Sequence, residues 1–522
     1  MATQLLIDGR IYSPSSPGAT AMAVTDGVIV WLGSDRPGLA LHPDAEVIRL
    51  EGAFVAPAFV DAHVHTTSFG LTRTGIDLSV ARNREECLSL LRNAASDVVW
   101  AQGWDDSAWP DSGPLTQAEV DGAVGDRVAY VPRIDGHSAI ASRALRSTVD
   151  GDLPEGMLTA DDHHRVRVIA QTLLSVEQRT EARTAALDLA ASRGVVSVHE
   201  CGGPKIGGLI DFRETLTFDH GVNVYGLWGQ AVETAEEARM VLAETGAAGL
   251  AGDLFVDGSI GSGTAALSEP YSDCPHSTGT RYLSDDAVRQ HIRACTEACV
   301  QAGFHAIGDA AIGAVTRGFE AAIEEFGSAA VAACHHRVEH AVMIAEEHIR
   351  VLALAGVIAS VQPGFEHAFG GANGSYARRI GADRARAVMP FAPMVAAGIP
   401  IAIGSDAPVT PLDPWAAVKA AVNHRTPGFA ISPRAAFGGA TRGGWRAAGV
   451  RDGVSGTLVP GAPASFAVWE PTELIVSTPK DAVQRWSTDP RSLVPPLPPL
   501  GADSVAPRCL RTVRAGRTIY AA

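Results

Sequence analysis

The stretch VAPAFVDAHVH, residues 55–65, says more about the fold than any other part of this sequence. It starts as an apolar run and ends in the pattern Asp61-x-His63-x-His65. Apolar runs of this length are typical of a buried strand in a parallel sheet. Side chains two apart in a strand share a face, so His63 and His65 are expected to project together. Such a pair can bind one metal ion, although two packing histidines are the alternative for an isolated pair.

The same arrangement, an apolar strand ending in polar residues, recurs along the chain, and helical segments separate most of the copies. One helix is expected at 284–301, with Ser284 as its N-cap, and another at 344–355, ending at Gly356. Eight such units predict an α/β fold of the (β/α)8 TIM-barrel type, whose chemistry lies on the loops after the strands. The eight strands are expected at 57–65, 195–200, 223–229, 250–257, 302–307, 336–341, 356–362 and 399–406.

Three other strand ends carry candidate metal ligands. His305 ends the fifth predicted strand, His340 ends the sixth and Asp406 ends the eighth. The barrel brings these ends to one rim, where four histidines and one aspartate converge. This is the ligand set of a zinc-type site with an open coordination position. We therefore expect one or two divalent ions, with zinc as the metal that suits these ligands.

The two ends of the chain follow a different pattern. Residues 1–55 and 450–522 hold short strands separated by turns, and we expect them to form one small discontinuous β-sandwich domain. The barrel domain is then 56–449. About 130 residues separate its first two strands, which predicts an insertion at about 66–194 over the barrel mouth. A loop region in that place is where substrate specificity is expected.

Composition excludes several classes of protein. The chain has 522 residues and a net charge of −16, which argues against binding a phosphate backbone or an anionic membrane. Its seven cysteines include no CxxC pair, which favours a reducing compartment over a disulfide framework. No signal peptide and no apolar run long enough to cross a bilayer is apparent. A cytoplasmic enzyme with a small-molecule substrate fits this composition, and a homodimer is the oligomeric state expected because many barrel enzymes form one.

Beyond the first strand, six short segments resemble those of a known superfamily. The chain is similar to the metal-dependent amidohydrolases, and in particular to the YtcJ-like or type 3 branch, which includes N-substituted formamide deformylases. The segments lie in family order and span nearly the whole chain. They are IDGHSA at 134–139, DGSIGS at 257–262, EPYSD at 269–273, HAIGD at 305–309, RVEHA at 337–341 and GSDAP at 404–408.

This resemblance implies a hydrolase that cleaves amide or related C–N bonds other than peptide bonds, such as N-acyl or N-formyl bonds. It assigns the metal to His63, His65, His305 and His340, with Asp406 beside the metal. A divalent metal lowers the pKa of bound water and so supplies hydroxide at neutral pH. Asp406 would take a proton from that water and deliver it to the leaving amine.

Three further residues are candidates for contact with the substrate. His137, in the insertion, would touch the substrate carbonyl or its oxyanion, unless it only bonds local backbone. Gln362 ends the seventh predicted strand and would face the rim. Trp104 would form an apolar wall of the pocket, with ordinary packing as the alternative.

The sequence departs from the family at three positions. Asp253 stands where the family has a Lys that can bridge two metals, so it is a shorter bridge, an acceptor for a ligand histidine or a salt-bridged structural residue. Gly263 and Ala310 stand where arginines are usual, which favours a fairly neutral substrate. Two other functions stay open: a deaminase or cyclic-amide hydrolase on the same barrel, and a non-catalytic binding protein with an altered metal centre.

Overall fold

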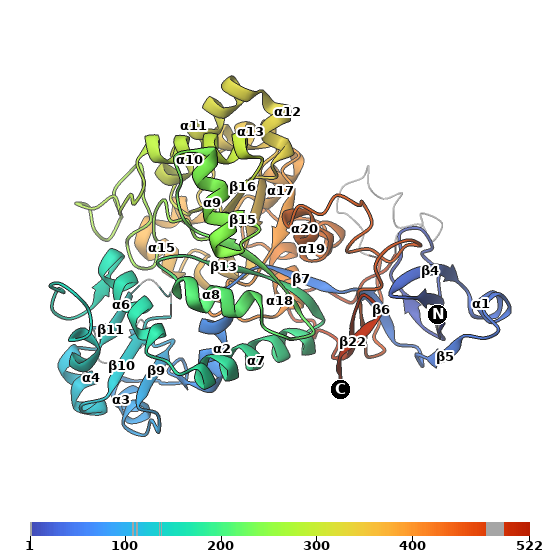
Figure 1. Ribbon diagram of the computed structural model, residues 1–522, viewed down its shortest axis with the longest axis horizontal. Helices are drawn as coiled ribbons and strands as arrows, with labels where there is room; N and C mark the ends of the chain where they lie inside the picture. The colour runs from blue at the N-terminus through green and yellow to red at the C-terminus, as the bar shows by residue number, and fades with distance from the viewer. Residues whose placement is uncertain (1–2, 107–108, 111–112, 135, 137, 477–494) are drawn as a thin grey trace.

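A sheet of eight parallel strands forms the centre of the molecule (Figure 1). The structure is a computed structural model, and it describes residues 3–522 apart from 107–108, 111–112, 135, 137 and 477–494. Strand order along the sheet follows the chain. The strands are β7 (Phe59–Val64), β13 (Val195–Gly202), β14 (Asn223–Trp228), β15 (Gly249–Leu250), β16 (Gln301–Ala306), β17 (Arg337–His340), β18 (Ile358–Val361) and β19 (Ile401–Ile403).

The sheet closes into a barrel at its two edge strands. Val64, the last residue of β7, and Ala407, after β19, form a parallel bridge. Asp61 reinforces this junction, because its Oδ1 accepts hydrogen bonds from the backbone nitrogens of Ser405 (2.9 Å) and His63 (3.2 Å). The predicted (β/α)8 barrel is confirmed, and the first and last strands are held side by side at the end that carries the polar residues.

The fourth strand differs from its prediction. A strand was expected over 250–257, but β15 ends at Leu250, and the chain touches the sheet again only at the bridge between Phe255 and His305. Gly252 explains the break: its φ is +75°, and a Cβ there would lie 3.1 Å from Cys201. The irregular segment carries Asp253 to the barrel mouth, where it lies beside His63 and His65.

Helices surround the barrel (Figure 1). The predicted helix at 284–301 exists as α10, with the Ser284 hydroxyl accepting from Ala287 N, but it ends at Ala298 because Cys299 adopts φ 57°. The predicted helix at 344–355 is α13. The helices after β13 are α8 (Gly208–Leu216), α9 (Ala235–Thr245), α10 (Asp285–Ala298), α11 (Asp309–Phe326), α12 (Ser328–Ala333), α13 (Glu346–Leu354), α14 (Pro363–Phe369), α15 (Ser375–Ile380), α16 (Ala382–Arg386), α17 (Phe391–Ala396), α18 (Pro414–Val422), α19 (Pro433–Ala440) and α20 (Arg442–Ala447).

The segment between β7 and β13 contains a sheet of its own, with strand order β12-β11-β10-β9-β8. It lies beside the barrel, drawn in blue to cyan in Figure 1. Two separate helices, α6 and α7, end this segment, because Ser175 forms a capping box that starts the second one. The elements are α2 (Thr66–Thr74), β8 (Ile76–Asp77), α3 (Arg84–Arg92), β9 (Val98–Gln102), α4 (Gln117–Val124), β10 (Val128–Pro132), β11 (Ser138–Ala141), α5 (Arg143–Arg146), β12 (Leu158–Thr159), α6 (Ala160–Thr172) and α7 (Val176–Ser192).

Both ends of the chain contribute to a second β-rich region, on the right of Figure 1. One sheet has the order β2-β6-β20-β21-β22 and so joins N-terminal and C-terminal strands, and the other has the order β4-β3-β1-β5. The elements are β1 (Thr3–Ile7), β2 (Arg10–Ile11), β3 (Ala21–Thr25), β4 (Val28–Gly33), α1 (Asp35–Leu41), β5 (Glu46–Arg49), β6 (Phe54–Pro57), β20 (Phe466–Trp469), β21 (Cys509–Arg514) and β22 (Arg517–Ala521).

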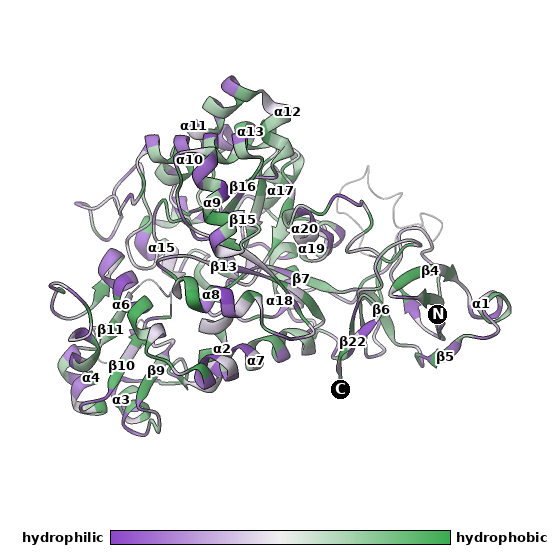
Figure 2. Cartoon of the chain, in the orientation of Figure 1, coloured by the Kyte–Doolittle hydropathy of each residue, from purple (hydrophilic) through white to green (hydrophobic). Residues whose placement is uncertain are grey.

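A cluster of aromatic rings joins this region to the barrel. The ring of Phe59, in β7, packs edge-on against Trp415 at 5.1 Å, Phe437 at 5.6 Å and Trp469 at 5.9 Å. In Figure 2 apolar residues follow the barrel strands, and hydrophilic residues appear on the outer helices and loops. Among the described residues, no helix is both long and apolar enough to cross a membrane.

The aromatic cluster leads to a stability prediction. Trp469→Ala should lower the free energy of unfolding by about 3–5 kcal/mol, because it removes a buried ring that both regions share. Val505→Ala, at an exposed position, should change it by less than about 0.5 kcal/mol. Urea unfolding followed by tryptophan fluorescence measures both. Equal midpoints for the two variants would mean that the cluster does not join the regions.

Candidate metal centre

Five of the residues expected at the rim come together in the structure. His63 is the next-to-last residue of β7, and His65 comes directly after that strand. His305 and His340 lie at the ends of β16 and β17, and Asp406 follows β19. Asp253 joins them from the irregular segment after β15. All six side chains are buried. Groups of three that could hold one ion are His63, His65 and Asp253; His63, His340 and Asp406; and Asp253, His305 and His340.

The spacing of these atoms fits a metal ion. His63 Nε2 lies 3.4 Å from Asp253 Oδ1 and 3.5 Å from Asp406 Oδ1. His65 Nε2 lies 3.2 Å from Asp253 Oδ2 and 3.3 Å from Asp406 Oδ1. Ligand atoms placed about 2.1 Å from a tetrahedral ion are about 3.4 Å from one another. The Nε2 atoms of His63 and His65 therefore each lie, from both carboxylates, at the separation of two ligands of one tetrahedral ion.

Charge and hydrogen bonding also favour a cation here. The side chains of Asp253 and Asp406 are buried, and neither forms an ion pair with Lys or Arg within the described part of the chain. Asp253 Oδ1, Asp406 Oδ1, His63 Nε2 and His340 Nε2 are buried without a hydrogen-bond partner among the described residues. Leaving such groups without a partner is costly. A divalent cation would satisfy the two carboxylates and the imidazole nitrogens together.

His63 is oriented by a buried ion pair. Its Nδ1 donates to Glu339 Oε2 at 2.9 Å, so Nε2 points into the cluster. Arg337 in turn binds Glu339 and donates to the carbonyl of Ala62 at 2.7 Å. Burial raises the pKa of Glu339, but the charge of Arg337 and the bond to His63 outweigh it and hold that pKa well below its usual range. Glu339 is therefore a carboxylate that can accept the His63 proton.

His199 lies behind this ion pair. Burial, followed by the charge of Arg337, holds the pKa of His199 well below its usual value. Its neutral Nδ1 accepts a hydrogen bond from Arg337 at 3.1 Å. His199 is therefore neutral and supports the ion pair. It adds no positive charge to the metal cluster.

His340 and His305 are each held by a neighbouring side chain. His340 Nδ1 donates to Gln362 Oε1 at 2.8 Å, which leaves Nε2 for the cluster. His305 Nδ1 lies 3.5 Å from Asp257 Oδ1. Asp257 is itself fixed by the backbone nitrogens of Ile307 and Gly308. Such acceptors set the ring orientation of metal-binding histidines.

The backbone at two of these residues has an unusual conformation. Asp406 has φ 54° and His340 has φ 71°, in the left-handed region that residues other than glycine seldom adopt. Asp406 N donates to His63 O at 2.8 Å, which fixes this turn against β7. Such conformations collect at functional sites and cost on the order of 1–3 kcal/mol each. They indicate that the fold keeps these two side chains in place although the backbone conformation lowers the free energy of unfolding.

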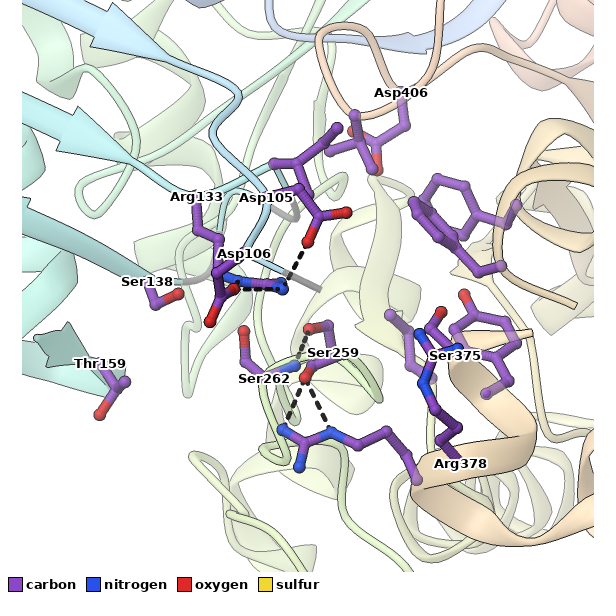
Figure 3. Close-up of a pocket in the computed structure, with 18 of the residues that line it drawn as sticks. Asp105, Asp106, Arg133, Ser138, Thr159, Ser259, Ser262, Ser375, Arg378 and Asp406 are labelled. Carbon is purple, nitrogen blue, oxygen red and sulfur yellow. Dashed lines mark hydrogen bonds and ion pairs between the residues drawn. The ribbon is translucent and has the colours of Figure 1, made fainter. Parts of the chain in front are cut away.

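A cavity of about 400 Å³ opens beside the cluster and is lined by His305, His340 and Asp406 (Figure 3). One wall is aromatic: Phe365, which stacks on the His340 ring at 5.7 Å, Phe369 and Tyr376. The opposite wall comes from the insertion, where Arg133 binds Asp105 at 2.9 Å and Asp106 at 3.1 Å. Both the barrel and the insertion therefore surround the space next to the cluster.

The candidates for substrate contact have different positions from those expected. Gln362 is buried behind His340 and holds its ring, and it does not line the described cavities. Trp104 is fully buried in the core of the insertion, with Nε1 donating to Val131 O at 3.0 Å. His137 lies outside the described residues. Gln362 was expected to face the substrate because it ends a strand, and Trp104 because its ring is apolar. Neither feature shows which side of the element is covered by other side chains, and for this reason the sequence did not locate them.

The sequence alone did not single out the ion pair of Arg337 and Glu339. A signal was present, since the opposite charges of Arg337 and Glu339 stand two apart in the predicted strand at 336–341. Residues two apart in a strand share a face, so a direct ion pair was the arrangement that could compensate both buried charges. What the sequence could not show is that the partner of Glu339 is His63, 276 residues away.

Comparisons with known proteins agree with this geometry. The model of the family described as "Amidohydrolase family" matches residues 46–520. The putative amidohydrolase YtcJ of Bacillus subtilis is 28% identical over 458 residues, covering 79% of this chain and 82% of that protein. The protein LONG AFTER FAR-RED 3 of Arabidopsis thaliana is 26% identical over 469 residues, covering 82% and 79%. The crystal structure of an uncharacterized metal-dependent hydrolase from Pyrococcus furiosus has the same fold, with a TM-score of 0.70, 24% identity and coverage of 90% and 98%.

The position of Gln362 leads to a test of its role. Gln362→Leu removes the acceptor of His340 Nδ1 without adding charge, so metal affinity should fall about 10- to 100-fold. Competition with a chromogenic chelator measures the affinity. If the variant instead keeps its metal affinity and changes only the KM for a substrate, Gln362 contacts the substrate, as the sequence first indicated.

Proposed function

Because the chain belongs to the amidohydrolase family and is a hydrolase of that superfamily, we propose that it cleaves a non-peptide C–N bond of a small molecule at a divalent metal centre. Amide, N-acyl and N-formyl compounds are the proposed substrates. The observation that supports this most is the cluster itself, in which buried carboxylates and imidazoles at the barrel mouth have the separation of metal ligands. The adjoining cavity provides the space for a small organic substrate.

Zinc is the metal that we propose, since imidazole and carboxylate ligands in a roughly tetrahedral arrangement suit it. His63, His65, Asp253 and Asp406 would hold one ion. His305 and His340, with Asp253 again, would hold a second. Asp253 belongs to both groups, which supports its role as a shared carboxylate in the place of the bridging Lys.

The chemistry requires a proton to move from water to the departing nitrogen. A divalent metal at this centre would polarise the scissile carbonyl and lower the pKa of a bound water. Asp406 borders both the cluster and the cavity, so it can accept the proton of the attacking water. Water oxygen then bonds to the carbonyl carbon, the C–N bond breaks, and Asp406 returns the proton to the nitrogen. Amines leave poorly without that proton, so one residue serves in both halves of the reaction.

A deaminase or cyclic-amide hydrolase is the second candidate. Partial similarity to imidazolonepropionase (29% identity over 29% of this chain) and to adenine deaminase (37% over 11%), both of Paracoccus denitrificans, favours it in part of the chain. Ring amides and exocyclic amines use the same proton transfers. Measuring ammonia release against carboxylate release over one panel of compounds separates the two candidates.

The role of Asp406 can be tested by one substitution. Asp406→Asn keeps the shape of the side chain but cannot accept a proton, so kcat should fall about 10²- to 10⁴-fold while zinc remains bound. Metal content is measured by mass spectrometry on the same samples. Turnover close to that of the unaltered protein would remove Asp406 from proton transfer.

The shared role of Asp253 predicts a change in stoichiometry. Zinc-loaded protein should hold about two equivalents, and Asp253→Asn should hold about one or fewer, because both ions lose a ligand. Asp503→Asn, at an exposed position without a hydrogen bond in the structure, is the matched control and should keep both. One equivalent in the unaltered protein and one in Asp253→Asn would rule out the shared carboxylate.

A further inference from the structure

A second, smaller cavity also borders the metal cluster. It has a volume of about 60 Å³, against about 400 Å³ for the cavity described above. We name them the inner cavity and the outer cavity. Both are lined by His305, His340, Asp406 and Val409, so they meet at the cluster. A substrate whose scissile bond lies at the metal can therefore place one part in each cavity.

The inner cavity is closed by side chains of the insertion. It is lined by His65 and Asp253 from the cluster and by Trp100, Gln102, Tyr130 and Arg167 from β9, β10 and α6. Its size admits a group of only a few heavy atoms. Its one described cationic side chain apart from any histidine is Arg167. The inner cavity is thus a small space that holds one positive charge next to the metal ligands.

Arg167 has no partner in the part of the chain that the structure describes. Its side chain is partly buried, and no hydrogen bond or ion pair connects it with Asp253, Asp406 or any other described residue. Its charge acts on the nearby Tyr130 hydroxyl: burial raises the pKa of Tyr130, and Arg167 opposes that rise. A guanidinium has five donors that suit a carboxylate. A guanidinium beside a cavity, without a partner among the described residues, is suited to bind an anionic group of a ligand.

The arginines of the outer cavity are different. Arg133 is bound by Asp105 and Asp106, and Arg379 is bound by Asp273 at 2.7 Å and by the carbonyl of Gly261. Arg378 is exposed on α15 at the rim of this cavity (Figure 3). Arg167 is therefore the one described arginine of the two cavities that is both partly buried and without an acidic partner.

We propose that Arg167 binds a carboxylate of the substrate, so that the protein hydrolyses amides that carry an acidic group a few bonds from the scissile bond, of which N-acyl amino acids are the simplest class. This rests on the proposed hydrolase function. The small inner cavity takes the carboxylate, and the outer cavity takes the larger group on the other side of the amide. The aromatic wall of Phe365, Phe369 and Tyr376 suits an apolar or aromatic group there.

The test compares amides in matched pairs. N-(phenylacetyl)glycine is paired with N-isobutyl phenylacetamide, which replaces the carboxylate by a neutral group of the same shape. N-benzylsuccinamic acid is paired with N-benzyl-4-methylpentanamide, so that the acid lies on the other side of the scissile bond. Values of kcat and KM are measured for zinc-loaded, full-length protein and for Arg167→Met, Arg167→Lys and Arg165→Met. Arg165 is on the same helix, is exposed and binds Asp162 at 2.9 Å, which makes it the matched control.

The expected result is a preference for the acid in at least one pair of about 10- to 100-fold in kcat/KM, the size of one hydrogen-bonded charge pair. Arg167→Met should abolish the preference, chiefly through KM, and Arg167→Lys should keep part of it. Arg165→Met should match the unaltered protein. Equal activity on acid and neutral partners in both pairs overturns the proposal while the hydrolase function stands. An equal loss on both partners in Arg167→Met also overturns it, because a structural or general catalytic role would then explain the residue.

Binding keeps the inference testable if no amide is cleaved. Calorimetry of the two acids on zinc-loaded Asp406→Asn protein avoids turnover, and adding Arg167→Met should weaken the binding of one acid about 10- to 100-fold. Unchanged binding of both acids overturns the role of Arg167. Absence of hydrolysis together with Arg167-dependent binding would count against the proposed function alone.

Discussion

The rest of this structure depends on two buried carboxylates that have no Lys or Arg partner among the described residues. Asp253 and Asp406 face imidazoles at the barrel mouth, where neither charge is compensated by a described Lys or Arg. Removing such charges from water is costly, and a divalent cation between them would compensate both. Other features follow from that constraint, including the histidines fixed by Glu339 and Gln362 and the left-handed backbone of Asp406. The barrel provides the frame because it brings residues from distant parts of the chain to one rim.

The fold and most of the cluster could be predicted from local patterns. Period-two spacing placed His63 and His65 on one face, and strand ends carrying His305, His340 and Asp406 had to meet if the strands formed a barrel. The regular strand over 250–257 was wrong because Gly252 turns the chain out of the sheet. That irregularity also brings Asp253 into the cluster. The role of Asp253, for which the sequence left three alternatives, therefore depends on the strand that local patterns predicted wrongly.

What local patterns could not supply is contact between elements. Gln362 was expected to face the substrate, yet it holds His340, because nothing in a strand end shows which neighbour covers it. The expectation of a neutral substrate considered only positions 263 and 310. In the structure the guanidinium of Arg379 would lie 3.3 Å from a Cβ at Gly263, and Arg167 reaches the cluster from the insertion. Positive charge at the mouth therefore comes from helices whose positions only the tertiary structure gives.

The central claim is that the cluster binds metal through both carboxylates. Anomalous diffraction at the zinc absorption edge, from crystals of the zinc-loaded protein, tests it most directly. The account predicts a strong peak about 2.0–2.2 Å from His63 Nε2, His65 Nε2 and oxygens of Asp253 and Asp406. A second peak is predicted between Asp253, His305 and His340. Peaks elsewhere in the protein, with none among these side chains, would contradict the account.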